Sequence, residues 1–253
     1  MGKLDGQVAV VTGAASGIGA AAAVALAAEG CAIAAVDLDG DGAAAVVSAI
    51  ERSGGRGTAI QVDLADSARA AAVVPQVIDE LGRVDILVNC AGIYPKGAPT
   101  LAELDEATWD RVYAVNLKAP FLLTQAFARH VAARDGGGRI VNLGSSGAYR
   151  AGSNAAYGAT KAAVVQLTRT AAGELARHGV NANTVAPGLT RTPMAVEVFG
   201  GDDEIDRVAA GANLFGRASE PEEVAAVILF LCLPESSQIT AQVIHTSAGG
   251  VIS

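Results

Sequence analysis

The chain has 253 residues, of which 51% are hydrophobic and 17% are charged, and its net charge at pH 7 is −8. This length suits one large α/β domain or two small ones, and a mean hydropathy of +0.37 supplies a large core. The acidic balance argues against a nucleic-acid partner, because nucleic-acid-binding proteins present a basic face. The low charged fraction predicts a surface partly buried against other subunits.

In chain order, short apolar runs alternate with longer helical stretches. The predicted elements are a strand at 7–12, a helix at 18–29, a strand at 31–38, a helix at 43–52, a strand at 58–62, a helix at 66–81, a strand at 86–89, a helix at 108–134, a strand at 139–143, a helix at 155–178, a strand at 180–185, an irregular segment with short helices at 187–216, a helix at 221–233 and a strand at 242–246. Near-continuous apolar strands joined by helices are typical of a parallel sheet covered on both faces. We therefore predict one α/β domain with a doubly wound sheet of about seven strands. A β/α barrel, the alternative, requires eight strand–helix units.

Cysteine and histidine usage gives no metal or disulfide signal. Cys31, Cys90 and Cys232 each lie within an apolar run, so we expect small buried residues in a reducing cytoplasm. The three histidines are widely separated, and no Cys/His cluster has metal-ligand spacing. We expect no metal site.

Nothing in the apolar pattern predicts a membrane partner. The first seven residues are polar and lead directly into a predicted strand, so no signal peptide is expected. The longest apolar runs, near 20–28 and 224–233, are too short to cross a bilayer. A cytoplasmic protein is the expectation.

The first predicted strand ends in a glycine-rich turn, TGAASGIG, which leads into a helix. Gly13, Gly17 and Gly19 permit a tight turn and a close approach of the backbone to a pyrophosphate. Ser16 and Ile18 lie where the helix N-terminus offers free N–H groups and a positive dipole end. This turn predicts a dinucleotide-binding site, although its G-x-x-x-G-x-G spacing also fits an ordinary strand-to-helix turn.

Two acids follow predicted strands. Asp37 ends the second strand, where a carboxylate can accept hydrogen bonds from the adenosine ribose of NAD. It would repel the extra phosphate of NADP, and neither Ser16 nor Leu38 carries a charge that would offset this repulsion. Asp63, with Leu64 after it, follows the third strand and could place a carboxylate near the adenine amino group. The alternative for both acids is a solvated turn, but together with the glycine turn Asp37 favours NAD as the cofactor.

Tyr157 and Lys161 stand four residues apart in a predicted helix and so share one face. The neighbouring cation is expected to lower the tyrosine pKa from about 10. Tyr157 could then exchange a proton with a substrate oxygen near neutral pH. Ser145 lies shortly upstream at the end of a predicted strand, with Ser146 as the alternative hydroxyl.

These residues together resemble the short-chain dehydrogenase/reductase family over essentially the whole chain. The motifs that carry the resemblance are TGAASGIG at 12–19, NCAG at 89–92, Asn116, Ser145 with Tyr157 and Lys161, PGLTRTPM at 187–194, and the terminal Gly249-Gly250. The resemblance implies a single NAD(P)-binding Rossmann-fold domain over 1–253.

The resemblance also implies roles for individual residues. Tyr157 is similar to the catalytic acid/base, Lys161 to the residue that lowers its pKa and binds the nicotinamide ribose, Ser145 to the hydroxyl that holds the substrate oxygen, and Asn116 to the residue that orders a water in the proton relay. The residues similar to those that contact the cofactor near the ribose and form the lip over the nicotinamide are Asn89, Ala91, Gly92, Pro187, Gly188, Thr190 and Thr192. Without the resemblance, Asn116 could satisfy backbone groups within its helix, and Pro187-Gly188 could be only a turn.

Three features depart from the family pattern. Ser145 and Tyr157 are one residue closer than in many members, which leaves Ser146 open as the catalytic hydroxyl. Cys90 replaces a frequent second asparagine. The segment 246–248 precedes the terminal glycines where a Val-Asp pair often stands.

The resemblance implies an NAD(H)-dependent oxidoreductase, assembled as a homotetramer, that acts on a small secondary alcohol or ketone. Two alternatives stay open: an NADPH-dependent 3-oxoacyl-carrier-protein reductase and a non-catalytic nucleotide-sensing regulator. The uncharged Ser16 counts against the first, and the intact catalytic set counts against the second. The substrate would be gripped by 94–100, 147–154 and 189–211, with an apolar wall from Tyr94, Tyr149 and Phe199.

Overall fold

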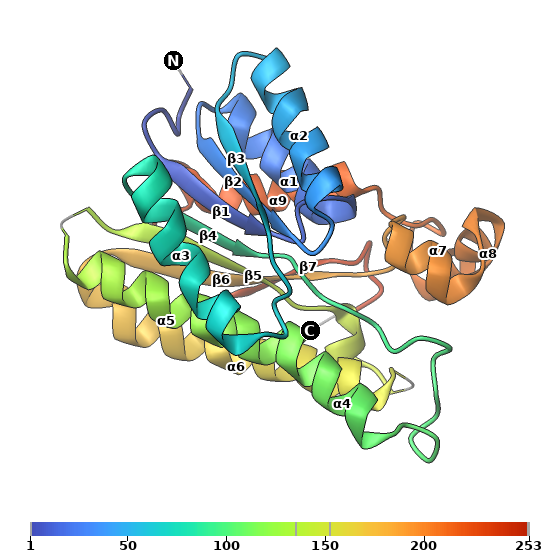
Figure 1. Ribbon diagram of the computed structural model, residues 1–253. Coiled ribbons are helices and arrows are strands. Elements are labelled where there is room, and N and C mark those ends of the chain that lie inside the picture. The colour runs from blue at the N-terminus through green and yellow to red at the C-terminus, as the bar shows by residue number, and fades with distance from the viewer. Residues whose placement is uncertain (1, 135, 152, 252–253) are drawn as a thin grey trace.

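The strands form one parallel sheet of seven strands in the order β3-β2-β1-β4-β5-β6-β7 (Figure 1). The computed structural model describes residues 2–134, 136–151 and 153–251. The strands are β1 Val8–Thr12, β2 Ala32–Asp37, β3 Gly57–Gln61, β4 Ile86–Asn89, β5 Gly138–Leu143, β6 Val180–Pro187 and β7 Val243–Thr246. The predicted doubly wound sheet is confirmed, and the barrel is wrong because β3 and β7 stand at opposite edges.

Helices cover both faces of this sheet. They are α1 Gly17–Ala28, α2 Gly40–Arg52, α3 Ser67–Leu81, α4 Glu106–Tyr113, α5 Ala119–Ala132, α6 Ala155–Leu175, α7 Pro193–Phe199, α8 Asp202–Ala212 and α9 Pro221–Cys232. One layer holds α3, α5 and α6, and the other holds α1, α2 and α9, while α7 and α8 project to the right of Figure 1. None of the helices within the described ranges is both long enough and apolar enough to cross a membrane.

The central strand β1 explains why the strands read as unbroken apolar runs. Successive side chains of a strand point to opposite faces. Val8 and Val10 accordingly pack into the core beneath α3, α5 and α6, whereas Ala9 and Val11 pack beneath α1, α2 and α9. A strand buried on both faces must be apolar at every position, so its sequence shows no alternation.

The chain builds the sheet outward from β1 in two directions: β2 and β3 lie on one side of β1, and β4 to β7 lie on the other. Thr12 at the end of β1 lies opposite Val36 of β2 and Asn89 of β4. In open α/β sheets such a switch point opens a crevice at the carboxyl ends of the strands, where ligands bind. The glycine turn, Asp37 and the NCAG segment therefore meet at one edge of the sheet.

Two local features differ from the predicted elements. The helix expected over 108–134 consists of α4, a π-helical turn at Ala114–Lys118, and α5. A short 3₁₀ helix, Ser146–Tyr149, follows β5 in a segment predicted as loop. The segment 187–216 contains two short helices, α7 and α8, as expected. Residue 152, within the expected substrate loop 147–154, lies outside the described residues.

Candidate active site

The glycine turn is so tight that side chains are excluded from it. A Cβ atom at Gly13, whose φ is +68°, would lie 2.9 Å from the Ala91 Cα, and one at Gly19 would lie 2.1 Å from the Gly13 carbonyl oxygen. Within the described chain, the Ser16 side chain caps no backbone N–H of α1. The helix thus presents unpaired donors and its positive end, an arrangement that fits a cofactor phosphate.

Asp37 links the end of β2 to this turn. Its Oδ2 accepts a hydrogen bond from the Ala15 backbone N–H at 2.9 Å, and its Oδ1 accepts one from the Asp39 N–H at 3.0 Å. Leu38 beside it is exposed. The carboxylate therefore stands beside the glycine turn, where the sequence analysis expects the adenosine ribose.

Asp63 and Leu64 are engaged elsewhere. The Asp63 carboxylate pairs with the Arg111 guanidinium at 2.9 Å and accepts a hydrogen bond from the Ala65 N–H. The hydrogen bond from Arg111 lowers the pKa of Asp63. Leu64 is buried in the core beneath α3. The Asp63 side chain thus ties the loop after β3 to α4.

Helix α6 places Tyr157 and Lys161 on one face, as predicted. Asn154 caps its start by accepting hydrogen bonds from the Ala156 and Tyr157 N–H groups. The Lys161 Nζ lies 5.7 Å from the centroid of the Tyr157 ring. Lys161 is only 3% exposed, and its Nζ donates a hydrogen bond to the Leu143 carbonyl oxygen at 2.8 Å.

Burial has the largest effect on the pKa values of both Tyr157 and Lys161. It raises the pKa of Tyr157, against the lowering effect of a hydrogen bond with Ser145, and the nearby Tyr94 raises that pKa further. Burial also lowers the pKa of Lys161 to about 8. The expectation that Lys161 lowers the tyrosine pKa is therefore not met here, because desolvation of the phenolate has the largest effect on that pKa.

Ser145, rather than Ser146, lies against Tyr157, the candidate acid/base. Ser145 follows β5, its side chain lowers the pKa of the Tyr157 phenol, and its hydroxyl accepts a hydrogen bond from the Gly147 N–H at 3.0 Å. Ser146 is buried as the first residue of the following 3₁₀ helix. The ring of Tyr94 packs against the ring of Tyr157, with its centroid 4.9 Å from that of Tyr157.

Asn116 lies in the π-helical turn, and its side chain leaves the helix. Its Oδ1 accepts a hydrogen bond from the Ile93 N–H at 2.8 Å, and its Nδ2 donates one to the Ile93 carbonyl oxygen at 3.0 Å. The backbone groups that it satisfies therefore belong to the loop after β4, not to its own helix. A π turn inserts one extra residue and turns the side chains that follow it, and no sequence pattern marked it.

Gly92 brings the loop backbone beside two catalytic candidates. A Cβ atom there would lie 3.2 Å from the Lys161 Nζ and 3.5 Å from the Asn116 Oδ1. Its neighbour Ala91 donates its N–H to the Thr12 hydroxyl at 3.1 Å. The NCAG backbone thus faces the site, as expected for a cofactor-contacting segment.

The Asn89 side chain points away from the site into a buried polar network. Its Nδ2 donates to the Asn142 Oδ1 at 2.7 Å, and the Asn142 Nδ2 donates to the Thr168 hydroxyl at 2.8 Å. These bonds tie β4, β5 and α6 together beneath the site. Only the backbone of Asn89 faces the carboxyl edge.

The segment after β6 closes over the glycine turn. Pro187 ends β6 opposite Thr246, and the hydroxyl of buried Thr190 donates to the Gly188 carbonyl oxygen at 3.3 Å. Thr192 caps α7 by accepting the Ala195 N–H, and its Cγ2 lies 3.1 Å from the position of a Cβ atom at Gly17. The residues proposed as a lip therefore lie beside the proposed phosphate site.

Sequence reasoning missed the clamp that holds α7 and α8, which we call the flap (193–212). The Arg191 guanidinium pairs with Asp202 at 2.9 Å, Asp206 at 2.7 Å and Glu220 at 3.2 Å. Three acids on one arginine join the segment before α7 to α8 and to the residue before α9. Their separations along the chain follow no fixed spacing, so no motif could reveal them.

The described residues offer no cluster of side chains that could bind a metal ion. Among the residues described, no group of three or more histidine, cysteine, aspartate or glutamate side chains could hold a metal ion. The three cysteines are buried as free thiols. Burial raises the pKa of Cys90 and of Cys232 to about 12, which leaves both as neutral thiols.

Comparison with known proteins establishes the family. A family model described as enoyl-(acyl carrier protein) reductase matches residues 13–250. Short-chain reductase protein NovJ of Streptomyces niveus is 41% identical over 247 residues, covering 96% of this chain and 93% of its own. The 3-oxoacyl-[acyl-carrier-protein] reductase FabG of Thermotoga maritima is 38% identical over 251 residues, covering 99% of this chain and 100% of its own. A Beutenbergia cavernae protein solved with NADP bound at low occupancy superposes with a TM-score of 0.90 at 36% identity, covering 99% of this chain and 98% of its own.

The chain therefore belongs to the short-chain dehydrogenase/reductase family. It is an oxidoreductase with a Rossmann-like sheet, and its cofactor is a nicotinamide dinucleotide.

Proposed function

We propose that this protein interconverts a secondary alcohol and a ketone with NAD(H), using Tyr157 as the acid/base. The observation that carries the proposal is that Ser145 lies close enough to Tyr157 to lower its pKa, beside the buried Lys161 and at the edge where the glycine turn lies. Turnover of NADH with a panel of ketones, followed by its absorbance, tests the proposal. The absence of turnover with every ketone and every secondary alcohol would contradict it.

The residues divide the chemistry between them. In reduction, Tyr157 donates its phenolic proton to the substrate oxygen. Ser145 donates a hydrogen bond to the same oxygen and stabilises the negative charge that develops there. The nicotinamide, when bound, supplies or accepts the hydride. In oxidation, Tyr157 takes the hydroxyl proton back.

Lys161 and Asn116 act around this pair. Lys161, with its Nζ beside Gly92, would hydrogen-bond the nicotinamide ribose and supply a positive charge next to the phenol. Asn116 fixes the Ile93 backbone and with it the wall next to Lys161. Its role in ordering a relay water rests on the family resemblance.

The preference for NAD rests on Asp37. Its carboxylate is anchored to the glycine turn through Ala15, so it cannot swing away from a ribose bound there without breaking that hydrogen bond. A 2′-phosphate would meet this charge at close range. We propose that kcat/KM for NAD exceeds that for NADP by about tenfold or more, a difference of roughly 1.4 kcal/mol. The NADP in the related solved structure makes this ratio the first measurement to take.

A second candidate is an NADPH-dependent 3-oxoacyl-carrier-protein reductase, which the relative from Thermotoga maritima favours. Exposed Ser16 and Leu38 offer no cation to a 2′-phosphate. Activity on a 3-oxoacyl thioester that is higher with NADPH than with NADH would select this candidate. Nucleotide binding without any turnover would select a third reading, a nucleotide-sensing regulator.

We further propose a homotetramer. Trp109 and Tyr113 of α4 and Phe121 of α5 are exposed large hydrophobic side chains on one helical stretch, and such surfaces commonly pack against partners. Light scattering should give about four times the chain mass of 25.2 kDa. A mass near that of one chain would contradict this assembly.

The setting that we propose follows from charge and composition. The chain would act as a single NAD(P)-binding domain in the cytoplasm. A net charge of −8 disfavours nucleic acid as a partner. The substrate would be a small molecule bound against Tyr94 and Tyr149, beside the catalytic tyrosine.

A further inference from the structure

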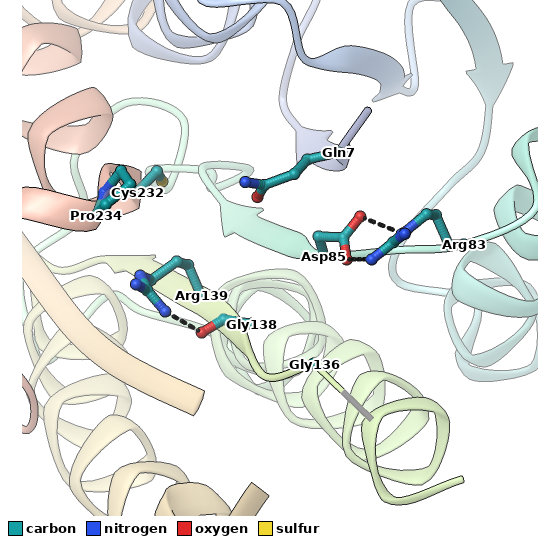
Figure 2. Close-up of a pocket in the computed structure, with 8 residues that line it drawn as sticks. All are labelled: Gln7, Arg83, Asp85, Gly136, Gly138, Arg139, Cys232 and Pro234. Atoms are coloured by element: carbon teal, nitrogen blue, oxygen red, sulfur yellow. Dashed lines mark hydrogen bonds and ion pairs between the residues drawn. The ribbon is translucent and has the colours of Figure 1, made fainter. Parts of the chain in front are cut away.

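A cavity of ≈ 200 Å³ lies at the edge of the sheet opposite the proposed active site (Figure 2). Gln7 before β1, Asp85 before β4 and Arg139 in β5 line it, and Cys232 at the end of α9 closes one side. Because all seven strands are parallel, this amino-terminal edge is separated from Ser145 by the length of β5. The cavity is thus independent of the proposed chemistry.

The Asp85 carboxylate in the cavity wall pairs with two positively charged groups. The Asp85 side chain is 6% exposed. The Arg83 guanidinium donates two hydrogen bonds to its carboxylate, from Nη2 at 2.6 Å and from Nε at 2.8 Å. The carboxylate also pairs with Arg134 at 2.9 Å and accepts the Val8 N–H at 3.0 Å. Two guanidinium groups and one backbone donor therefore serve a single negative charge.

Arg139 adds a third guanidinium that has no such partner. Its Nη1 donates to the carbonyl oxygen of Gly138, and its Nε is buried without a hydrogen-bond partner among the residues described. Within 2–134, 136–151 and 153–251, no carboxylate lies in ion-pair distance of it. A partly buried, unpaired charge is costly unless something compensates it, and burial accordingly lowers the pKa of Arg139.

Other groups in the cavity favour an anion. Figure 2 shows the Gln7 amide and the Arg139 guanidinium bordering the same space. Cys232 adds no negative charge, because burial raises its pKa to about 12. Among the described lining residues, Arg83 and Arg139 stand against the single carboxylate of Asp85. Arg134 pairs with that carboxylate from outside the lining, so three guanidinium groups exceed one carboxylate by two positive charges.

We propose that this cavity binds a small tetrahedral dianion, inorganic phosphate or sulfate, held chiefly by Arg139. The planar guanidinium fork matches two oxygens of such an ion. The cavity is smaller than the roughly 300–1,000 Å³ of sites for drug-sized ligands, which suits an ion with a few waters. The bound ion would complete the ion network between β1, β4, β5 and α9 and stabilise the folded chain by mass action.

The test is titration of the full-length protein with phosphate, by calorimetry and by phosphorus NMR. Wild-type protein should bind phosphate saturably, and Arg139→Gln should weaken this binding by about tenfold or more, as expected for loss of charge-assisted hydrogen bonds. Arg139→Lys, which keeps the charge but not the fork, should fall between the two. Arg52→Gln, an exposed arginine in the last turn of α2, is the matched control and should bind like wild type.

The design separates this site from the glycine turn. Phosphate held at the glycine turn would survive in Arg139→Gln and would be displaced by NADH, whereas phosphate in the cavity should be lost in Arg139→Gln and unaffected by NADH. Sulfate should compete with phosphate, and acetate should compete at least about tenfold less well because it carries one charge. If Arg139→Gln fails to fold, as judged by circular dichroism, Gln7→Leu should still weaken binding several-fold.

Three results would overturn the proposal. They are no saturable phosphate binding in wild type, equal binding by wild type and Arg139→Gln, and acetate binding as tight as that of phosphate. Because none of these measurements uses catalysis, failure of the proposed oxidoreductase activity would leave this proposal intact.

Discussion

The Lys161 ammonium nitrogen donates a hydrogen bond to the Leu143 carbonyl oxygen at 2.8 Å, which ties the middle of α6 to the end of β5. This contact holds a side chain that is only 3% exposed. The charge therefore stands beside Tyr157 at the cost of its own solvation. Burial lowers the pKa of Lys161 to about 8, well below that of a free lysine.

Lys161→Met should stabilise the fold at pH 7 while abolishing most activity. The folded-state pKa of Lys161 lies below its unfolded value, so the native state binds fewer protons, and the cost is fully present below about pH 8. A shift of this size corresponds to about 3 kcal/mol, and leaving the Leu143 carbonyl without its donor removes about 1 kcal/mol of the gain. We expect a net gain of about 1–2 kcal/mol in the free energy of unfolding.

The pH dependence is the sharper part of this prediction. Wild-type stability should rise relative to Lys161→Met as pH increases from about 8 to 10.5, because the native lysine is then already neutral. Urea unfolding of both proteins at pH 7 and at pH 10 measures the difference. A gap that stays constant between these pH values would show that Lys161 is not buried as a cation.

Tyr157→Phe removes the phenolic hydroxyl and keeps the ring that packs against Tyr94. Turnover should fall by about 10²-fold or more, the usual loss when general acid–base catalysis is removed. NADH binding, measured by fluorescence, should change little because the ring and Lys161 remain. Wild-type turnover by this variant would contradict the proposed mechanism.

Asp37→Ser should narrow the preference for NAD over NADP mainly by weakening NAD. The variant loses the carboxylate that we propose faces the ribose and also the bond to the Ala15 N–H. The matched control is Asp39→Ser, because Asp39 caps α2 two residues further on and serine also caps helices well. The ratio of kcat/KM values should fall several-fold in Asp37→Ser only. An equal fall in both variants would assign the effect to net charge rather than to the ribose contact.

Arg191→Gln should loosen the flap. A single exposed ion pair contributes little to stability, but three of them converge on one guanidinium. We expect faster hydrogen exchange over 193–212 and a several-fold higher KM, with thermal stability nearly unchanged. Arg207→Gln is the control, since Arg207 pairs with Glu204 within its own helix α8. Unchanged hydrogen exchange over 193–212 in Arg191→Gln would contradict the role of Arg191 in holding the flap.

The sheet and the catalytic helix could be predicted from the sequence because their causes are local. Buried strands must be apolar on both faces, and the i, i+4 spacing of Tyr157 and Lys161 fixes their common face. The glycine turn could also be predicted from the sequence, since Gly13 and Gly19 stand where the backbone leaves no room for a Cβ atom.

The remaining features depend on contacts between distant segments. The π turn around Asn116 is paired with Ile93, 23 residues away, and its sequence AVNLK is compatible with a regular helix. The pKa of Tyr157 depends on how deeply the folded chain buries its phenol. Burial raises this pKa, whereas the sequence predicted that Lys161 would lower it. Arg191 finds its acids only after α8 and α9 have packed, and Arg139 shows its missing partner only in three dimensions.

The flap has a hydrophobic cluster of its own. Ile205 and Ala209 of α8 pack with Ala195 of α7 and with Ala218, apart from the two large clusters on either face of the sheet. Substitutions within the flap therefore leave the packing of the main scaffold untouched. The region that we propose binds the substrate can thus diversify as an exchangeable module, and grafting 193–212 from a relative with another substrate would leave the lip residues Thr190 and Thr192 in place.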